Sequence, residues 1–440
     1  MAIRSRRARL PNSARFAAVT LASLVGTVAA TPPGPTFSRD VAPIIYRHCA
    51  ACHHTGAVAP FPLNSYQDVA KRAHLIARVT ASRYMPPWLP STPHFQNERR
   101  LTEAEIDTLQ RWAAAGAPEG NSAQAPPAPH FDSGWLLGSP GLEVEMRGSY
   151  SVPAEGPDLY QCFVIPLPNL PNRYVKAIDI RPGNPGVVHH ALLFQDVTRE
   201  ARRRDKGEGY PCFGTPGFLP ARGLGGWTPG KEPVPAPSGM AETLYAGADL
   251  VLQVHYHPTG KPETDRTRVA LYFTPDPPRR HLTDIGLGSN RIDIPAGEAR
   301  YQVTDHFTLP VPVDVIGVIP HAHYVCKDMR GYAILPGGAR RTLIHIADWN
   351  FNWQEQYRYS TPIRLPAETR LEMVFTYDNS EANPRNPNHP PKRVVYGPAS
   401  TDEMAGLHFE VVPVSESDAD ELGQALWGKM MRMLGGGVYR

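Results

Sequence analysis

Residues 187–194 read VVHHALLF, an apolar run with two adjacent histidines that begins directly after the pair Pro185-Gly186. Short apolar runs bounded by proline and glycine predict β-strands. Similar runs recur at residues 175–180, 250–254, 313–319 and 371–375. The 48 prolines and 37 glycines in 440 residues argue against long helices, because an interior proline costs a helix about 3 kcal/mol. We therefore expect two all-β sandwiches, over residues 131–280 and 281–415.

The start of the chain differs from this pattern. Basic residues precede an apolar stretch that ends in small residues at 28–30, which is the layout of a cleaved signal peptide over residues 1–30. The apolar stretch is shorter than the ~18 residues that a membrane span needs. An uncleaved N-terminal anchor is the alternative. Either layout places the body of the protein outside the cytoplasm. With the signal peptide cleaved, we expect a periplasmic or secreted protein without a stable membrane span.

A second motif lies just beyond this leader, where residues 49–53 read CAACH. A C-x-x-C-H segment supplies two thiols, here Cys49 and Cys52, for the vinyl groups of haem, and one imidazole, here His53, for the iron. Met85 lies in a later proline-rich loop and is the candidate for the second iron ligand. The alternatives are a redox-active or zinc-binding cysteine pair and a methionine buried in the core.

Residues 31–120 as a whole resemble a class I cytochrome c domain, since the haem-binding motif, the methionine and a closing amphipathic helix follow in the usual order. The resemblance implies a covalent haem c that transfers electrons. The expected fold class is therefore multidomain: a small all-α cytochrome c domain, a linker at residues 121–130, and the two sandwiches.

Histidine is unusually frequent, with 17 His against 5 Cys. Strand-like places hold three groups of them: His189 with His190, His255, and His321 with His323. Residues i and i+2 share one face of a strand, so the third group can bind a single ion. The adjacent pair in the first group can do so only at a bulge or a strand end. Each group alone is also consistent with structural histidines, but three groups in one exported redox chain favour metal binding.

Four segments together resemble the signatures of the copper type II, ascorbate-dependent monooxygenases, the family of peptidylglycine α-hydroxylating monooxygenase and dopamine β-hydroxylase. They are VVHHALLF at 187–194, LQVHY at 252–256, HAH at 321–323 and TDEM at 401–404. The resemblance implies two jelly-roll-like sandwiches that hold one copper ion each. It assigns the electron-transfer copper to His189, His190 and His255. It assigns the catalytic copper to His321, His323 and Met404.

The ligand types agree with this resemblance, because imidazole binds both oxidation states of copper and a thioether favours Cu(I). Two positions depart from the peptide-hydroxylating members: Ile319 replaces a carboxylate-binding arginine, and His408 replaces a tyrosine. These departures argue against a peptide carboxylate as substrate. A disulfide common in the family is also missing, with Ala405 and Met373 at its two places.

The remaining cysteines allow at most one intrachain disulfide once Cys49 and Cys52 are assigned to haem. Cys162 with Cys212 is the candidate pair, and Cys326 is interpreted as an ordinary packing residue.

The sequence thus predicts an exported copper-dependent monooxygenase that hydroxylates a C–H bond of a small organic substrate with O₂. The fused haem would replace or supplement ascorbate as electron source, reaching the electron-transfer copper first and the catalytic copper second. A non-catalytic c-type cytochrome or copper-binding redox protein, which docks a redox partner protein, is the main alternative. A zinc hydrolase is the weaker one, because the chain lacks an H-E-x-x-H motif.

Two further features of the sequence concern the expected partners and the residues not yet assigned. The net charge of +3 is too small for a nucleic-acid-binding surface, so no nucleic acid is expected as a partner. His257 is interpreted as a turn residue, and the tail at residues 416–440 as a helix on the second sandwich, from its apolar spacing.

Overall fold

The computed structural model describes residues 34–55, 59–92, 94–130, 134–218, 222–229 and 231–435. The expected signal peptide lies outside these residues. Pro35–Arg440 form one compact unit, and six α-helices are found among its described residues. Most of its regular structure is β-sheet. No helix in the described ranges is both long and apolar enough to cross a membrane.

The helices near the start of the chain share one apolar core. They are a π-helical turn η1 (Phe37–Val41), followed by α1 (Ala42–His48), α2 (Tyr66–Ala70), α3 (Ala73–Ala81) and α4 (Glu103–Ala114). Leu109 and Trp112 of α4 are fully buried in this core. α4 begins with a capping box, in which Thr102 Oγ1 accepts from Glu105 N and the Glu105 carboxylate accepts from Thr102 N. A short 3₁₀ turn, η2 (Ser122–Gln124), follows these helices.

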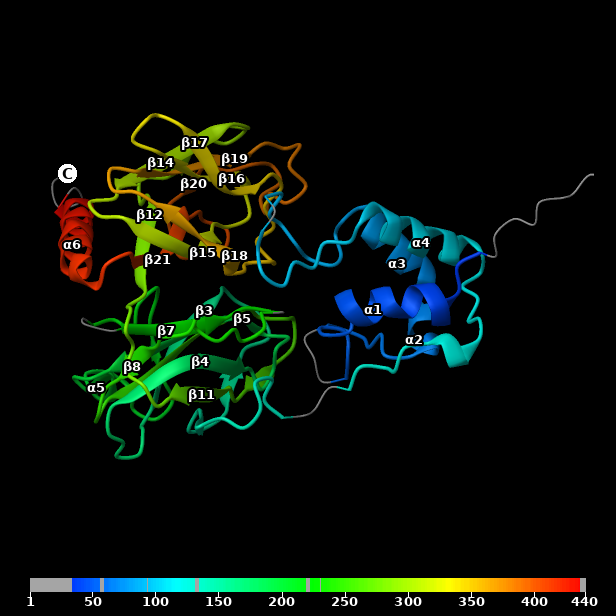
Figure 1. Cartoon of the computed structure of the whole chain (residues 1–440), viewed down its shortest axis with the longest axis horizontal. Coiled ribbons are helices and arrows are strands. Elements are labelled where there is room, and N and C mark those ends of the chain that lie inside the picture. Colours follow the sequence, from blue (N-terminus) through cyan, green and yellow to red (C-terminus); the bar gives the residue numbers. More distant parts are fainter. Residues whose placement is uncertain are drawn as a thin grey trace, which may run out of the picture. The chain divides into compact units, whose positions relative to one another are not determined.

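The first sandwich has a four-stranded layer in the order β1-β11-β4-β8 and a five-stranded layer in the order β6-β3-β9-β5-β7 (Figure 1). Strands β10 and β2 pair separately, and α5 (Ala201–Arg204) follows β5. The strand bounds are β1 Leu142–Glu145, β2 Tyr150–Val152, β3 Leu159–Ile165, β4 Arg173–Arg181, β5 Val188–Asp196, β6 Tyr210–Pro211, β7 Arg222–Trp227, β8 Glu242–Leu244, β9 Asp249–Tyr256, β10 Glu263–Asp265 and β11 Arg268–Thr274. All eight residues of β9 are buried, because both faces of this strand are covered.

The second sandwich packs a layer in the order β12-β21-β15-β18 against a layer in the order β14-β19-β16-β17 (Figure 1). Strands β13 and β20 form a separate pair. The strand bounds are β12 Thr283–Gly288, β13 Asp293–Ile294, β14 Tyr301–Thr308, β15 Val313–His321, β16 Cys326–Ile334, β17 Arg340–Ile346, β18 Tyr357–Leu365, β19 Arg370–Tyr377, β20 Val394–Val395 and β21 Gly406–Pro413.

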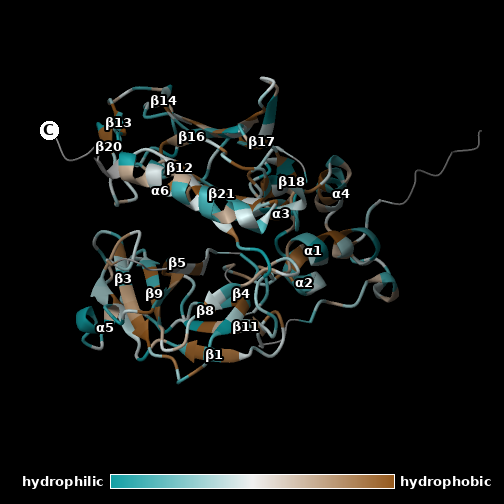
Figure 2. Ribbon diagram, turned by 60° about the vertical axis from the view of Figure 1, so that its left-hand side comes forward, coloured by the Kyte–Doolittle hydropathy of each residue, from teal (hydrophilic) through white to brown (hydrophobic). Residues whose placement is uncertain are grey.

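The alternation of residues along the strands builds these two cores. In β19, buried positions alternate with half-buried ones along most of the strand, as a period of two requires. Apolar and polar colours accordingly alternate along several strands in Figure 2. Beyond a 3₁₀ turn, η3 (Glu416–Asp418), the terminal helix α6 (Ala419–Gly435) places Leu422 in the core of the second sandwich.

The segment between α3 and α4 leaves the helical core and lies on the second sandwich. We call residues 84–92 and 94–100 the strap. Phe95 of the strap is 4% exposed, belongs to the core of the second sandwich, and forms a β-bridge with Tyr359. Ser91 N donates to His345 O at 2.7 Å, and Gln96 N donates to Arg358 O at 2.8 Å. The strap therefore joins the helices to the sheets.

The expected fold class is wrong. It requires a small all-α cytochrome c domain ahead of two jelly-roll-like sandwiches, but within the described part of the chain no separate all-α domain is formed. The helices α1 to α4 belong to the same compact unit as the sandwich-like sheets, and the whole is mostly β. The physical reason is the strap. Its Phe95 side chain is buried in the core of the second sandwich and not in the core that the helices share.

The candidate disulfide is confirmed: Cys162 and Cys212 are bonded and join β3 to the residue after β6. Cys326 is a free, buried cysteine.

Replacing Phe95 with Ala should destabilise the compact unit by about 3–5 kcal/mol, the usual cost of deleting a buried phenylalanine. Calorimetric unfolding, with limited proteolysis of the strap, measures the change. Tyr84→Ala is the matched control, because Tyr84 is 52% exposed in the same segment. Equal losses in the two variants would contradict the role given to the strap.

Candidate metal centres

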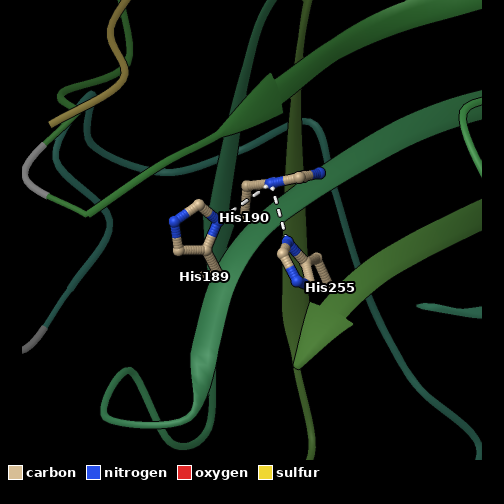
Figure 3. Close-up of side chains that lie close together, drawn as sticks. All are labelled: His189, His190 and His255. Atoms are coloured by element: carbon tan, nitrogen blue, oxygen red, sulfur yellow. Dashed lines mark hydrogen bonds between the residues drawn. The ribbon is translucent and has the colours of Figure 1, made fainter. Parts of the chain in front are cut away.

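Neighbouring strands β5 and β9 bring three histidines together, His189 and His190 from β5 and His255 from β9 (Figure 3). His190 lies opposite His255 in the register. The pairing shifts between Val188 and His190, and this irregularity lets two adjacent residues face one site. The sequence-based requirement for a bulge at this pair is confirmed.

The three rings point nitrogens at one another. Nδ1 of His190 lies 3.2 Å from Nδ1 of His189 and 3.4 Å from Nδ1 of His255. One ligand atom from each residue lies within 4.8 Å of the others. Burial lowers the pKa of His189 to about 3, lowers that of His190 well below its usual value, and lowers that of His255. Three neutral imidazoles crowded in this way fit a metal ion as their shared partner.

A carboxylate supports this trio from behind. Asp158 Oδ1 lies 2.7 Å from His257 Nδ1, and Asp158 Oδ2 lies 3.1 Å from His255 Nε2 without the angles of a regular hydrogen bond. Partners of this kind orient ligand imidazoles. The ring of Tyr160 stacks on His255 with centroids 4.1 Å apart. His257, which the sequence predicts to be a turn residue, contacts the same Asp158 carboxylate and so lies next to the three histidines.

The second centre forms where β15 ends beside the start of β21, at the register pair His321 and Gly406. His321 Nε2 lies 3.4 Å from Met404 Sδ, and His321 Nδ1 donates to Gln354 Oε1 at 2.5 Å. His323 Nδ1 donates to the Asp402 carbonyl at 3.1 Å. Both imidazoles thus use Nδ1 as a donor, which leaves the lone pair of Nε2 for a metal ion.

Burial keeps these two imidazoles neutral. It lowers the pKa of His321 to about 4 and that of His323 to about 3. Two neutral imidazoles and a thioether form a donor set that suits copper, and Cu(I) in particular. The structure places Met404 beside His321, and the rings of His321 and His323 lie 5.4 Å apart between centroids; that these residues bind one ion stays a prediction.

Glu403 holds the backbone around this centre. Its buried carboxylate accepts hydrogen bonds of 2.8–3.0 Å from four backbone N–H groups. The donors are His323, Val325, Cys326 and Met404. Burial raises the pKa of Glu403 to about 8, against the opposing effect of these four donors. Glu403 belongs to the TDEM segment, but no local signal in the sequence indicates its role in holding this backbone.

Phe351 lies between the two centres. This residue is 4% exposed, stacks on His189 at 4.5 Å, and meets the His323 ring edge-on at 5.4 Å between centroids. The neighbouring Trp349 is fully buried and donates from Nε1 to the His323 carbonyl. The loop that carries these aromatics, between β17 and β18, thus touches ligands of both centres. The sequence does not predict a role for Phe351 or Trp349, because no local pattern relates this loop to the histidines.

A cavity of about 640 Å³ opens on both centres. Among its lining residues are His190 of the first centre and His321 and Met404 of the second. Ile319 and His408, the two positions that depart from the peptide-hydroxylating family members, also line it. An organic molecule in this cavity would therefore lie beside the ligands of both centres.

The C-x-x-C-H segment contains one oriented imidazole and two free thiols, and its binding of haem stays a prediction. His53 Nδ1 donates to the Phe61 carbonyl at 3.0 Å, so its Nε2 is left for iron. Cys49 and Cys52 are free thiols, and burial raises the pKa of Cys49 to about 12. A redox-active cysteine pair needs a lowered thiol pKa, so this environment disfavours that alternative. Met85 follows α3, with its N–H donating to Val79 O, and its role as iron ligand stays a prediction.

Comparisons with known proteins add no function. No protein-family model and no curated protein matches the chain. Among solved structures, PNGF-II is 10% identical with a TM-score of 0.27, over 61% of this chain and 65% of that one. The major capsid protein P2 of bacteriophage PM2 is 8% identical with a TM-score of 0.24, over 62% of this chain and 98% of that one. The chain thus spans just under two thirds of PNGF-II, and likenesses this weak carry no argument.

Replacing Glu403 with Gln should remove one metal ion from the second centre and leave the first centre loaded. An amide presents only one acceptor oxygen and turns an NH₂ group toward backbone donors, at a cost of about 1–3 kcal/mol for each buried donor left unsatisfied. Metal content per chain measures the outcome after loading with copper. Glu416→Gln, at an exposed position, is the control. Full copper content in Glu403→Gln would contradict this role.

Proposed function

We propose that the protein is an exported copper-dependent monooxygenase that hydroxylates a C–H bond of a small organic molecule with O₂. The observation that carries this proposal is the pair of neutral imidazole sets, one of them with a thioether, from which His190, His321 and Met404 line a single organic-sized cavity. The disulfide between Cys162 and Cys212 supports export, because such bonds persist in oxidising compartments.

Each residue has a defined part in this function. His189, His190 and His255 would hold the electron-transfer copper, with Asp158 fixing the orientation of His255. The second ion, the catalytic copper, would be held by His321, His323 and Met404, with Gln354 fixing the tautomer of His321. Copper supplies O₂ binding and single-electron exchange, so that RH, O₂, two electrons and two protons give ROH and water. The cavity wall positions the substrate and excludes bulk water.

A haem bound at Cys49, Cys52 and His53 is proposed as the electron source, with ascorbate as a further reductant. Cys52 lies within electrostatic reach of Arg99, Glu232 and Glu355, and these three residues line the cavity. Arg99 of the strap donates to both carboxylate oxygens of Glu355, at 3.2 and 2.6 Å. Glu355 directly follows Gln354, the partner of His321. Polar residues of the cavity wall thus extend from Arg99 of the strap to Gln354 beside the second centre.

Replacing Met404 with Ile should abolish product formation while leaving the haem spectrum unchanged, because the substitution removes a thioether ligand and keeps an apolar side chain. Oxygen uptake coupled to product detection by mass spectrometry is the measurement. Met431→Ile is the control, since Met431 is 49% exposed on α6. If the copper-loaded wild type consumes no O₂ with any of a broad panel of substrates, the alternative of a non-catalytic redox protein is favoured.

The electron-donor role has a separate test. Stopped-flow spectroscopy of the reduced haem should show reoxidation by O₂ that depends on bound copper, and His255→Ala should slow it at least tenfold. The control is Cys49→Ala/Cys52→Ala, which should lose the covalent haem and retain both copper ions. Reoxidation at the same rate in copper-free protein would rule out this role.

A further inference from the structure

The wall of the cavity beside the second centre contains a histidine outside the proposed ligand sets. His408 of β21 lines the cavity together with His321 and Met404. It lies two residues beyond Gly406 and therefore on the same face of the strand. Gly406 is paired with His321 of the neighbouring strand β15. His408 thus lies one step along this face from the second centre.

Two glycines leave room for the His408 ring and indicate where its Nε2 lies. A Cβ on Gly286, opposite His408 in β12, would come within 3.2 Å of Cε1 and 3.3 Å of Nδ1. A Cβ on Gly406 would lie 3.6 Å from Nε2 and 3.7 Å from the Cβ of His321. Nε2 and the His321 side chain therefore border the same empty position, on the cavity face of Gly406.

The other ring nitrogen faces a carboxylate. His408 Nδ1 lies 2.8 Å from Asp284 Oδ2 and donates to it. Asp284 belongs to β12, lies outside the lining of the cavity, and has a side chain that is 56% exposed. The side chain of His408 is 42% exposed. The pair therefore spans the cavity wall, with the imidazole on the cavity side and the carboxylate in contact with solvent.

The charges around His408 favour its protonated form. Burial lowers its pKa, but Asp284 and Glu410 outweigh this effect and raise the pKa above the usual value. Of the strands in the same layer, β15 presents His321, which burial keeps neutral. β18 presents Arg358, which lies 3.9 Å from Glu410 and offsets part of its charge. Asp284 is therefore the principal partner of the His408 ring.

The two other histidines of the described cavity wall behave in the opposite way. Burial lowers the pKa of His190 well below its usual value and lowers that of His321 to about 4. A neutral imidazole can bind a metal ion, whereas a protonated one cannot. His408 thus differs from the ligand histidines in the property that separates holding a metal ion from carrying a proton.

We propose that His408 donates a proton from Nε2 to the oxygen atom that leaves as water, and that Asp284 positions its ring. The inference rests on the proposed function, in which each turnover consumes two protons. The Nε2–H bond breaks, an O–H bond forms on the departing oxygen, and the neutral ring keeps its Nδ1–H bonded to Asp284. Solvent then returns a proton to the ring, since the His408 side chain is partly exposed.

The protonation of His408 is measured in copper-free, full-length protein, so that this readout does not depend on turnover. In an NMR titration, Asp284→Asn should lower the pKa of the His408 ring by about one unit, because the variant removes an opposite charge. The matched control is Glu416→Gln, which removes the carboxylate 3.6 Å from His281. This control should leave the His408 titration unchanged. A wild-type His408 that titrates below the usual imidazole range would overturn the inference.

The role in turnover is tested in copper-loaded protein. Product formation should fall as the pH rises through the pKa of His408, because only the protonated ring can donate. Asp284→Asn should move this fall to lower pH by the amount that the titration gives. His408→Gln should form product about 100-fold more slowly with unchanged copper content, as expected for loss of a general acid. His281→Asn, outside the cavity lining, is the control and should keep the wild-type rate.

Chemical rescue separates proton donation from a structural role. His408→Ala removes the ring, and added imidazole should restore part of the rate if a proton donor is what the variant lacks. A slow variant that imidazole does not rescue, a wild-type rate in His408→Gln, or an unmoved pH profile in Asp284→Asn would each overturn the inference. If His408→Gln does not fold, Asp284→Asn still decides. A copper-loaded wild type that consumes no O₂ would instead overturn the proposed function, and this inference with it.

Discussion

The buried carboxylate of Glu403 is the interaction on which the second metal centre depends. A carboxylate in the protein interior is costly unless its oxygens are hydrogen-bonded. Here four backbone N–H groups meet that requirement, and three of them belong to the turn that carries His323. The fourth belongs to Met404. One side chain therefore joins the end of β15 to the start of β21, and the backbone that carries the ligands cannot relax without breaking these hydrogen bonds.

The first centre also has a carboxylate beside it, but this one contacts imidazole rings and not backbone N–H groups. Asp158, at the start of β3, stands behind His255 on the neighbouring strand β9. Phe351 then places one aromatic ring against ligands of both centres. Because close packing on both sides limits the movement of a ring, Phe351 connects the first imidazole set to the second by direct contact.

Much of the β-structure could be predicted from local pattern. The apolar runs at 175–180, 250–254, 313–319 and 371–375 all fall within strands, in β4, β9, β15 and β19. The three histidine groups converge on two sites, because strand pairing aligns residues that share a face. The separate helical domain was predicted wrongly for a related reason. Phe95 looks like an ordinary core residue in sequence, and its partner Tyr359 lies on a distant strand that no local pattern reveals.

The residues that determine substrate choice are the hardest to predict, and the cavity shows why. Metal ligands carry a chemical identity that a sequence displays, since histidine and methionine are rare and their spacing is constrained. Glu410 and Gln356, which line the cavity, have no such signature. Their hydrogen bonds exist only because Gln356, next to β18, lies between Glu410 of β21 and Lys231 of the other sandwich. Short motifs thus suffice to predict candidate metal ligands, whereas the lining of the cavity depends on the contact between the two sandwiches.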